Sequence, residues 1–159
     1  MDDAVKKEAL RLFTYGLYAV SCGDGRQRNA FTANWLTQVS FDPPLVALSV
    51  EHDSHSLPII QRTGRFVVNV FAADQRELAG TLGKPYSRHP EKAVGLRVEM
   101  TPSGCPALAE SLAWIQCEVV NEMEAGDSTL VLARVSEARV LRPGGEPLTM
   151  RAAGFKHAG

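Results

Sequence analysis

The chain has 159 residues, a formal net charge of −1, 45% hydrophobic residues and 22% charged residues, which is typical of a single globular domain with a buried core. The near-neutral charge gives no basis for binding nucleic acid or an anionic membrane surface, and both are excluded as expected partners. No run approaches the roughly 20 apolar residues that span a bilayer.

Cysteine use and the first residues both favour a cytoplasmic location. Cys22, Cys105 and Cys117 are widely spaced and form no CxxC pair, which favours reduced thiols. The opening MDDAVKKEALRLF is too charged for a signal peptide.

In chain order, the pattern predicts a single domain over residues 1–159, with about six mostly antiparallel strands and two or three short helices. The expected strands are 17–22, 28–41, 45–51, 65–71, 112–124 and 128–141. The expected helices are 2–13, a segment that starts near Ser54 or Ser56 and closes at Gly64, and 74–83 with Asp74 as its cap. Asp42-Pro43-Pro44 ends the second strand, because proline cannot donate a ladder hydrogen bond. The tail GGEPLTMRAAGFKHAG reads as irregular, and so many strands favour a small β-barrel with peripheral helices.

Several chemical motifs are missing from the sequence. It has neither GxGxxG nor GxxxxGK[ST], and it lacks the GxSxG of a nucleophile elbow. The nearest approach to a metal motif is His52-Asp53-Ser54-His55, but spacing suggests no third ligand. Surface or capping roles are therefore favoured for these residues, and no metal site is predicted.

Three segments combine small polar and basic residues in patterns suited to a ligand. Ser54-His55-Ser56 at a helix start offers hydroxyls and free N–H groups for a phosphate, or an ordinary N-cap. Lys84, Arg88 and Lys92 share one loop that either closes over an anion or is a solvated basic loop. Asn34 and Trp35 offer an amide and an aromatic face to a flat heterocycle, although Trp35 suits core packing equally well.

Asn69 is a polar residue within the apolar strand RFVVNVF. Burial there demands a hydrogen-bond partner, and a satisfied structural asparagine is the favoured interpretation.

The order of these segments resembles the flavin reductase-like family of FMN-binding split barrels. The matching pieces run from FTYGLYAVSC through TANWLTQVSFDPPLVALSV, SHSLPII, GRFVVNVFAADQRELA and EKAVGL to ALAWIQCEVV and GDSTLVLARV. They cover most of residues 11–141. The resemblance implies a mainly β fold, an antiparallel, Greek-key-like split β-barrel with peripheral short helices. It also implies a homodimer that binds flavin near the dimer interface.

The resemblance also assigns the ligand-binding positions, with no catalytic residue because the flavin itself reacts. Thr32 to Trp35 are implied to contact the flavin, Thr37 and Ser40 to face its ribityl and phosphate side, and Ser49 to lie beside the ring. The cofactor-binding set is Thr32, Ala33, Asn34, Trp35, Thr37, Ser40, Ser49, Ser54, His55, Ser56, Arg88 and Lys92.

The implied function is an NAD(P)H-dependent flavin reductase with FMN as cofactor, FAD as the alternative, and NADH or NADPH as co-substrate. Hydride would pass from the nicotinamide to flavin N5, and a flavin-dependent monooxygenase or another acceptor would take the electrons. The alternative is an FMN-binding electron carrier resembling flavoredoxin, with a haem-handling split barrel as a more distant one. Ser128 motivates the carrier, because many reductases of the family have the histidine of a GDH motif there.

Overall fold

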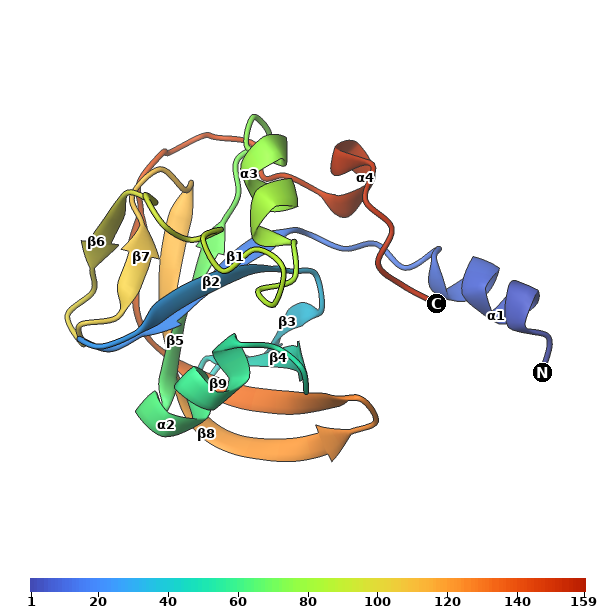
Figure 1. The fold of residues 1–159 in the computed structure, drawn as a ribbon, viewed down its shortest axis with the longest axis horizontal. Helices are drawn as coiled ribbons and strands as arrows, with labels where there is room; N and C mark the ends of the chain where they lie inside the picture. The colour runs from blue at the N-terminus through green and yellow to red at the C-terminus, as the bar shows by residue number, and fades with distance from the viewer.

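The computed structural model describes residues 1–159 and is built mainly from antiparallel strands (Figure 1). The strands are β1 (Tyr18–Gly23), β2 (Arg28–Ala33), β3 (Leu36–Ser40), β4 (Leu45–Glu51), β5 (Arg65–Val70), β6 (Val98–Met100), β7 (Pro106–Leu108), β8 (Ala113–Ala125) and β9 (Ser128–Val140). Seven of them form one sheet in the order β2-β1-β5-β8-β9-β4-β3, and β6 pairs with β7. The prediction of a mainly β, antiparallel split barrel is confirmed.

A two-residue link makes the large sheet curl. Strands β2 and β3 lie at opposite edges of the sheet, yet only Asn34 and Trp35 separate them in the chain. Neighbouring strands lie about 4.8 Å apart, so the two edge strands of a flat sheet of this order would lie about 29 Å from each other. Two linking residues span only about 10 Å. The edges must therefore approach each other, and since β2 and β3 share no ladder the barrel is split at this point.

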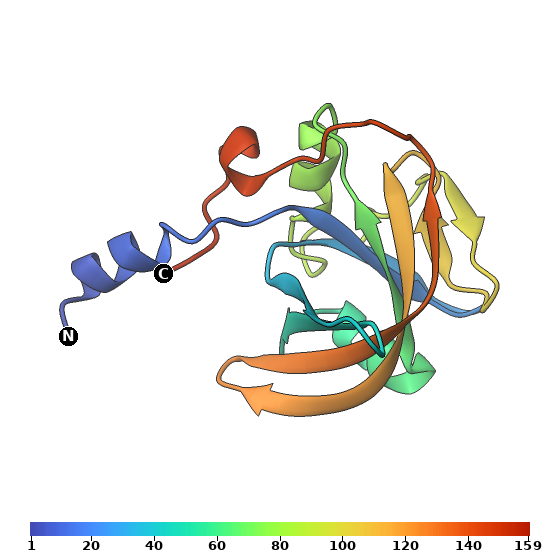
Figure 2. The same ribbon diagram turned by 180° about the vertical axis from the view of Figure 1, so that it is seen from behind.

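The long hairpin β8–β9 joins the two halves of this barrel. The first half of β8 pairs with β5, from Ala113 to Glu118, and the first half of β9 pairs with β4, from Ser128 to Arg134. The register between β8 and β9 shifts at Gln116/Cys117 and again at Val119/Asn121. Such bulges bend a strand and increase its twist, so the hairpin curves from one half into the other (Figure 2).

Four helices decorate the barrel: α1 (Asp3–Leu10), α2 (Ser56–Thr63), α3 (Arg76–Leu82) and α4 (Met150–Ala153). Helix α1 has no buried residue and projects from the body beside the C-terminus (Figure 1). Helix α2 ends at Gly64 with φ of 68°, a left-handed conformation that glycine adopts without a steric penalty. The structure contains no helix that is both long enough and apolar enough to span a membrane.

The main core lies inside the curled sheet. It includes fully buried side chains from four strands and from α2, among them Val20, Leu48, Phe66, Val68, Val131 and Ile60. A second cluster packs α3 and α4 against one end of the barrel, around Leu17, Phe71, Leu82 and Ala153. These contacts place the short helices beside the end of the barrel where β2 terminates.

Buried Asn69 ties the small β6–β7 sheet to the large one. Its Nδ2 donates to the carbonyl of Ala19 at 2.8 Å and to Ser21 Oγ at 2.9 Å, and its Oδ1 accepts from the Leu108 N–H at 2.7 Å. Ser21 Oγ in turn donates to the Pro106 carbonyl. The predicted structural role of Asn69 is confirmed, because every partner is a group of the fold.

Some predicted boundaries are wrong. The strand predicted over 28–41 is interrupted at Asn34–Trp35, and the tail predicted as irregular contains α4, which Thr149 caps through a bond from the Ala152 N–H. Asp74 does not cap α3, which has Gln75 at its N-cap without a side-chain cap bond. Short β6 and β7 were not predicted at all.

We expect Asn69→Ala to lower the free energy of unfolding by about 3 kcal/mol, because the Leu108 N–H and the Ala19 carbonyl would each lose a buried partner. Urea denaturation followed by circular dichroism measures this change. Asn121→Ala on the exposed part of β8 is the control, with an expected change within about 0.5 kcal/mol. Equal effects of the two substitutions would contradict the role of the Asn69 network.

Candidate ligand pocket

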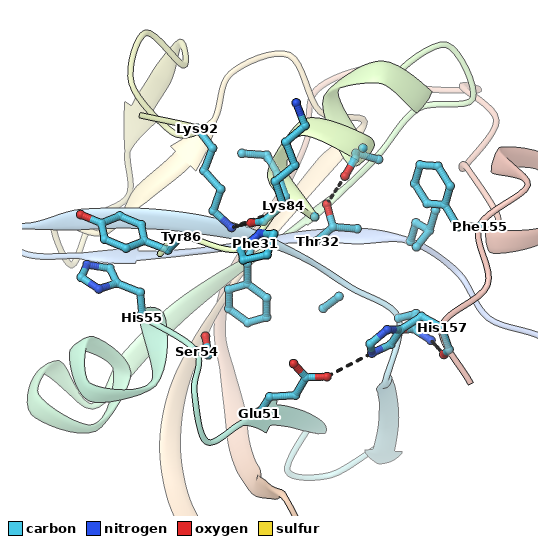
Figure 3. Close-up of a pocket in the computed structure, with 18 of the residues that line it drawn as sticks. Phe31, Thr32, Glu51, Ser54, His55, Lys84, Tyr86, Lys92, Phe155 and His157 are labelled. Carbon is cyan, nitrogen blue, oxygen red and sulfur yellow. Dashed lines mark hydrogen bonds and ion pairs between the residues drawn. The ribbon is translucent and has the colours of Figure 1, made fainter. Parts of the chain in front are cut away.

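One large pocket opens where the barrel is split, with a cavity volume of about 620 Å³. Its walls come from β2, from the β2–β3 link, from β4 and the turn after it, from α3, from the loop 84–92 and from the C-terminal tail. Phe31 projects into the middle of it (Figure 3). Residues far apart in the chain therefore share one concave surface, as a small-molecule site requires.

Eight of the twelve predicted binding residues line this pocket. They are Thr32, Ala33, Asn34, Trp35, Ser49, Ser54, His55 and Lys92. The other four, Thr37, Ser40, Ser56 and Arg88, lie outside its walls.

The four outlying residues have identifiable surroundings. Thr37 is exposed on β3, and Ser40 is half-buried at the end of that strand beyond the interruption. Arg88 is exposed on the loop. Ser56 is fully buried, and its Oγ accepts from Asn29 Nδ2 at 2.9 Å, which anchors α2 to β2.

The start of α2 offers hydrogen-bond donors to the pocket. His55 stands at the N-cap position without a side-chain cap bond, and the His55 backbone N–H has no partner within the chain. Ser54 Oγ accepts from the Ser56 N–H at 3.3 Å, so the predicted capping by Ser54 consists of this one bond. The free N–H and the helix dipole together favour an anion at this point.

Lys92 provides a cation that is built into the wall. The side chain is only 9% exposed, and its ammonium donates to the carbonyls of Leu82 at 2.8 Å and Lys84 at 2.9 Å. Burial lowers the pKa of Lys92 to about 8. An ammonium has three donors, so one N–H remains for a ligand.

An aromatic pair stands next to this cation. The rings of His55 and Tyr86 are stacked, with centroids 3.5 Å apart and planes inclined by 3°. Gln27 Nε2 lies 2.6 Å from His55 Nε2. Burial, and secondly the charge of Lys92, lowers the pKa of His55, so this imidazole favours its neutral form.

The opposite end of the pocket has a different chemistry. Between the two ends, Thr32 Oγ1 donates to the Ala79 carbonyl at 2.6 Å and so ties β2 to α3. Asn34 is 6% exposed, and its Nδ2 donates to the carbonyl of His157 at 3.0 Å. His157 Nε2 lies 3.3 Å from Glu51 Oε1, and the His157 ring lies 5.2 Å from that of Trp35 (Figure 3).

Several lining residues were not among the predicted set. The most informative are Phe31, Glu51, Lys84, Tyr86, Phe155 and His157. Lys84 belongs to the loop that the sequence suggests for closing over an anion, and it lines the pocket, whereas Arg88 of the same loop does not. Tyr86 could have been proposed as a lining residue because it is an aromatic residue in that loop. Phe155 and His157 reach the pocket through long-range packing, which no local sequence pattern predicts.

Two other residues singled out in the sequence lie off the pocket. His52 Nε2 lies 3.2 Å from Glu124 Oε2, so this histidine pairs with a carboxylate on β8. Ser128 is 2% exposed, and its hydroxyl donates to Asp127 Oδ1 at 3.1 Å. Neither residue lines the cavity.

Comparison with known proteins agrees with this architecture. A flavin reductase from Pseudomonas putida is 32% identical over 84% of this chain and 78% of its own length. The structure of the NADH:FAD oxidoreductase SgcE6 of Streptomyces globisporus, in complex with NAD and FAD fragments, superposes with a TM-score of 0.78 at 28% identity, covering 86% of this chain and 81% of that one. Nitrilotriacetate monooxygenase component B from Mycobacterium thermoresistibile gives a TM-score of 0.81 at 26% identity, covering 92% and 80%.

The chain spans only part of several curated relatives that it matches, from 23% to 62% of their length. The family model described as "Flavin reductase like domain", in contrast, matches residues 10–159, which is nearly the whole chain. The curled sheet, the split between β2 and β3 and this match together show that the chain belongs to the flavin reductase-like domain family.

Proposed function

We propose that this chain binds FMN in the split-barrel pocket and catalyses reduction of flavin by NADH or NADPH. The observation that carries the proposal is the chemical asymmetry of the pocket. One end presents two lysines and the free His55 N–H, and the other presents the amide of Asn34 beside the Trp35 ring. A flavin nucleotide has the same division between an anionic phosphate and a flat heterocycle.

The residues at the cationic end fit a phosphate. Lys92 has one N–H unused and is held rigidly by two carbonyls, and the exposed Lys84 adds a second positive charge. The free His55 N–H and the Ser54 hydroxyl supply further donors. Charge-assisted hydrogen bonds of this kind are about twice as strong as neutral ones.

The residues at the other end fit the ring. Asn34 keeps one N–H and its Oδ1 after bonding to the tail, a donor and acceptor pair that complements an imide edge. Trp35, together with Phe31 in the middle of the pocket, offers aromatic surface, and Ser49 offers a small hydroxyl that leaves room. When bound, flavin supplies the hydride acceptor, so the chain's contribution is to hold and orient the ring and to exclude water.

The proposal that a nicotinamide donates the hydride depends on similarity to known proteins. The SgcE6 structure holds fragments of NAD and FAD, and the family resemblance implies the same pair of reactants for this chain. Similarity to a monooxygenase component B supports a flavin-dependent monooxygenase as one acceptor of the electrons. FMN rather than FAD is proposed because the groups described above account for a phosphate and a ring and none of them is assigned to an adenine.

The first test is anaerobic mixing of FMN-loaded protein with NADH and, separately, NADPH, while the flavin absorbance near ~450 nm is followed. Bleaching at a catalytic rate, ~1–1000 s⁻¹, with at least one nucleotide is expected. Bound FMN that stays oxidised with both nucleotides would contradict the reductase and support the electron carrier, for which the burial of Ser128 away from the pocket is the favouring observation.

FMN affinity should depend on pH through Lys92. Its pKa of about 8 lies below the ordinary value of 10.5, so the free pocket loses this charge as pH rises through 8. Since phosphate binds the protonated form, we expect the Kd for FMN to rise about tenfold between pH 7 and pH 9. Fluorescence titration measures the Kd, and riboflavin, which lacks the phosphate, should show no such change.

Substitution separates Lys92 from other titrating groups. Lys92→Met should weaken FMN binding about tenfold at pH 7 and remove the pH dependence, while riboflavin binding stays nearly unchanged. Lys84→Ala is the comparison, with a smaller loss because this ammonium is exposed. Parallel pH profiles for FMN and riboflavin in the wild-type protein would refute a phosphate contact by Lys92.

We also propose that the chain forms a homodimer. Large apolar side chains directly after β3 and on β8 are exposed, with Phe41 at 92%, Val120 at 52% and Met123 at 60%. Exposed apolar surface of this kind marks an interaction site. Light scattering should give twice the chain mass of 17.3 kDa, and a Phe41→Glu/Met123→Glu variant should give the monomer; a monomeric wild type would contradict the dimer.

A further inference from the structure

The C-terminal segment Phe155–His157 forms one wall of the pocket, although it belongs to no helix or strand. It follows α4, which ends at Gly154 in the left-handed conformation. Phe155 and His157 lie across the pocket from His55 and Tyr86 (Figure 3). The segment therefore faces the ring end of the pocket and leaves the phosphate end open.

Two anchors in the pocket wall hold the segment, and directly after it Arg11 Nε donates to the Ala158 carbonyl at 3.4 Å. The Phe155 ring lies 5.5 Å from the guanidinium carbon of Arg76, whose Nε donates to the Ala153 carbonyl at 2.6 Å. Further along, the His157 carbonyl accepts from Asn34 Nδ2 at 3.0 Å. The first anchor belongs to the packed core around α3, whereas the second depends on a single amide of the pocket wall.

The His157 side chain is held more loosely than its backbone. Its Nε2 lies 3.3 Å from Glu51 Oε1, and the two side chains are 56% and 50% exposed. A polar contact so exposed contributes little to folding, so it can break and form again at small cost. The tilted contact with the Trp35 ring, at 5.2 Å and 46°, is the other interaction of this imidazole.

Asn34 connects the segment to whatever occupies the ring end. One N–H of its amide donates to the His157 carbonyl, and the other N–H and Oδ1 are left for a ligand. A ligand that bonds to those remaining groups fixes the orientation of the amide, and with it the position of the tail. Occupancy of the pocket and closure of its wall are thus coupled through one side chain.

We propose that His157 is a contact residue for the bound flavin ring, that Glu51 is its positioning residue, and that this wall sets how slowly flavin leaves the pocket. The inference rests on the proposed binding of FMN. Loss of the wall opens the ring end, so dissociation accelerates while the phosphate contacts are unchanged.

Dissociation of FMN, with no nicotinamide present, tests the proposal. FMN-loaded protein is diluted rapidly, and the recovery of FMN fluorescence gives the release rate. His157→Ala should release FMN about five- to tenfold faster, and deletion of residues 156–159, which leaves Phe155 in place, should have at least that effect. His52→Ala, which removes a comparable histidine–glutamate pair outside the pocket, should leave the rate within about twofold.

The positioning role of Glu51 has its own readout. Glu51→Gln should accelerate release in the wild-type background but have no effect when combined with His157→Ala, because it acts only through that imidazole. His157→Phe, which keeps a ring against Trp35, should recover part of the slow release. Thermal melts confirm that each variant is folded.

Two failures are distinguishable. If the wild-type chain binds no FMN at equilibrium, the proposed function itself is wrong. If FMN binds but His157→Ala and the deletion release it at the wild-type rate, the wall has no part in retention and only this inference is overturned.

Discussion

The two-residue link Asn34–Trp35 is the constraint on which the rest of this structure depends. It joins strands at opposite edges of a seven-stranded sheet, so the sheet has to curl until those edges meet. The curl leaves a gap that no ladder closes, and the pocket opens there. The link itself is part of the lining, and the Trp35 carbonyl accepts from the Ser49 N–H at 3.0 Å, which secures it to β4. Closure of the fold and formation of the site therefore have the same cause.

The same link explains which site residues could be predicted from sequence. The local pattern treats 28–41 as one strand, and the resemblance places Thr37 and Ser40 on it together with Thr32, beside the flavin. The interruption at Asn34–Trp35 restarts the alternation on β3, which leaves Thr37 exposed. Thr32 to Trp35 therefore line the pocket, whereas Thr37 and Ser40 directly after the break do not. The local pattern could not show this difference, because the break follows from a distant strand order.

Other parts of the fold also differ in whether local sequence was enough to predict them. The hairpins β1–β2 and β8–β9 have strong local patterns and glycine-containing turns, and both were predicted. The tail gave no local signal, since α4 has only four residues and its position depends on packing against α3. Lys92 was found because a cation in a basic loop is a chemical signal. Its burial, which lowers its pKa, depends on the packing of the loop against the end of α3 and could not be predicted from that signal.

Glu51 lies at the end of β4, between the start of β9 and the C-terminal tail. In the β4–β9 ladder this residue pairs with Ser128, whose hydroxyl is turned to Asp127 and does not reach the pocket. On its other side Glu51 meets His157 from the C-terminal tail. The resemblance implies a histidine at the position of Ser128, whereas the imidazole that stands against Glu51 here comes from the C-terminal tail. Because His157 belongs to a tail outside the sheet and not to the β8–β9 turn, the proposed retention of flavin would depend on the contacts of that tail rather than on a side chain fixed on β9.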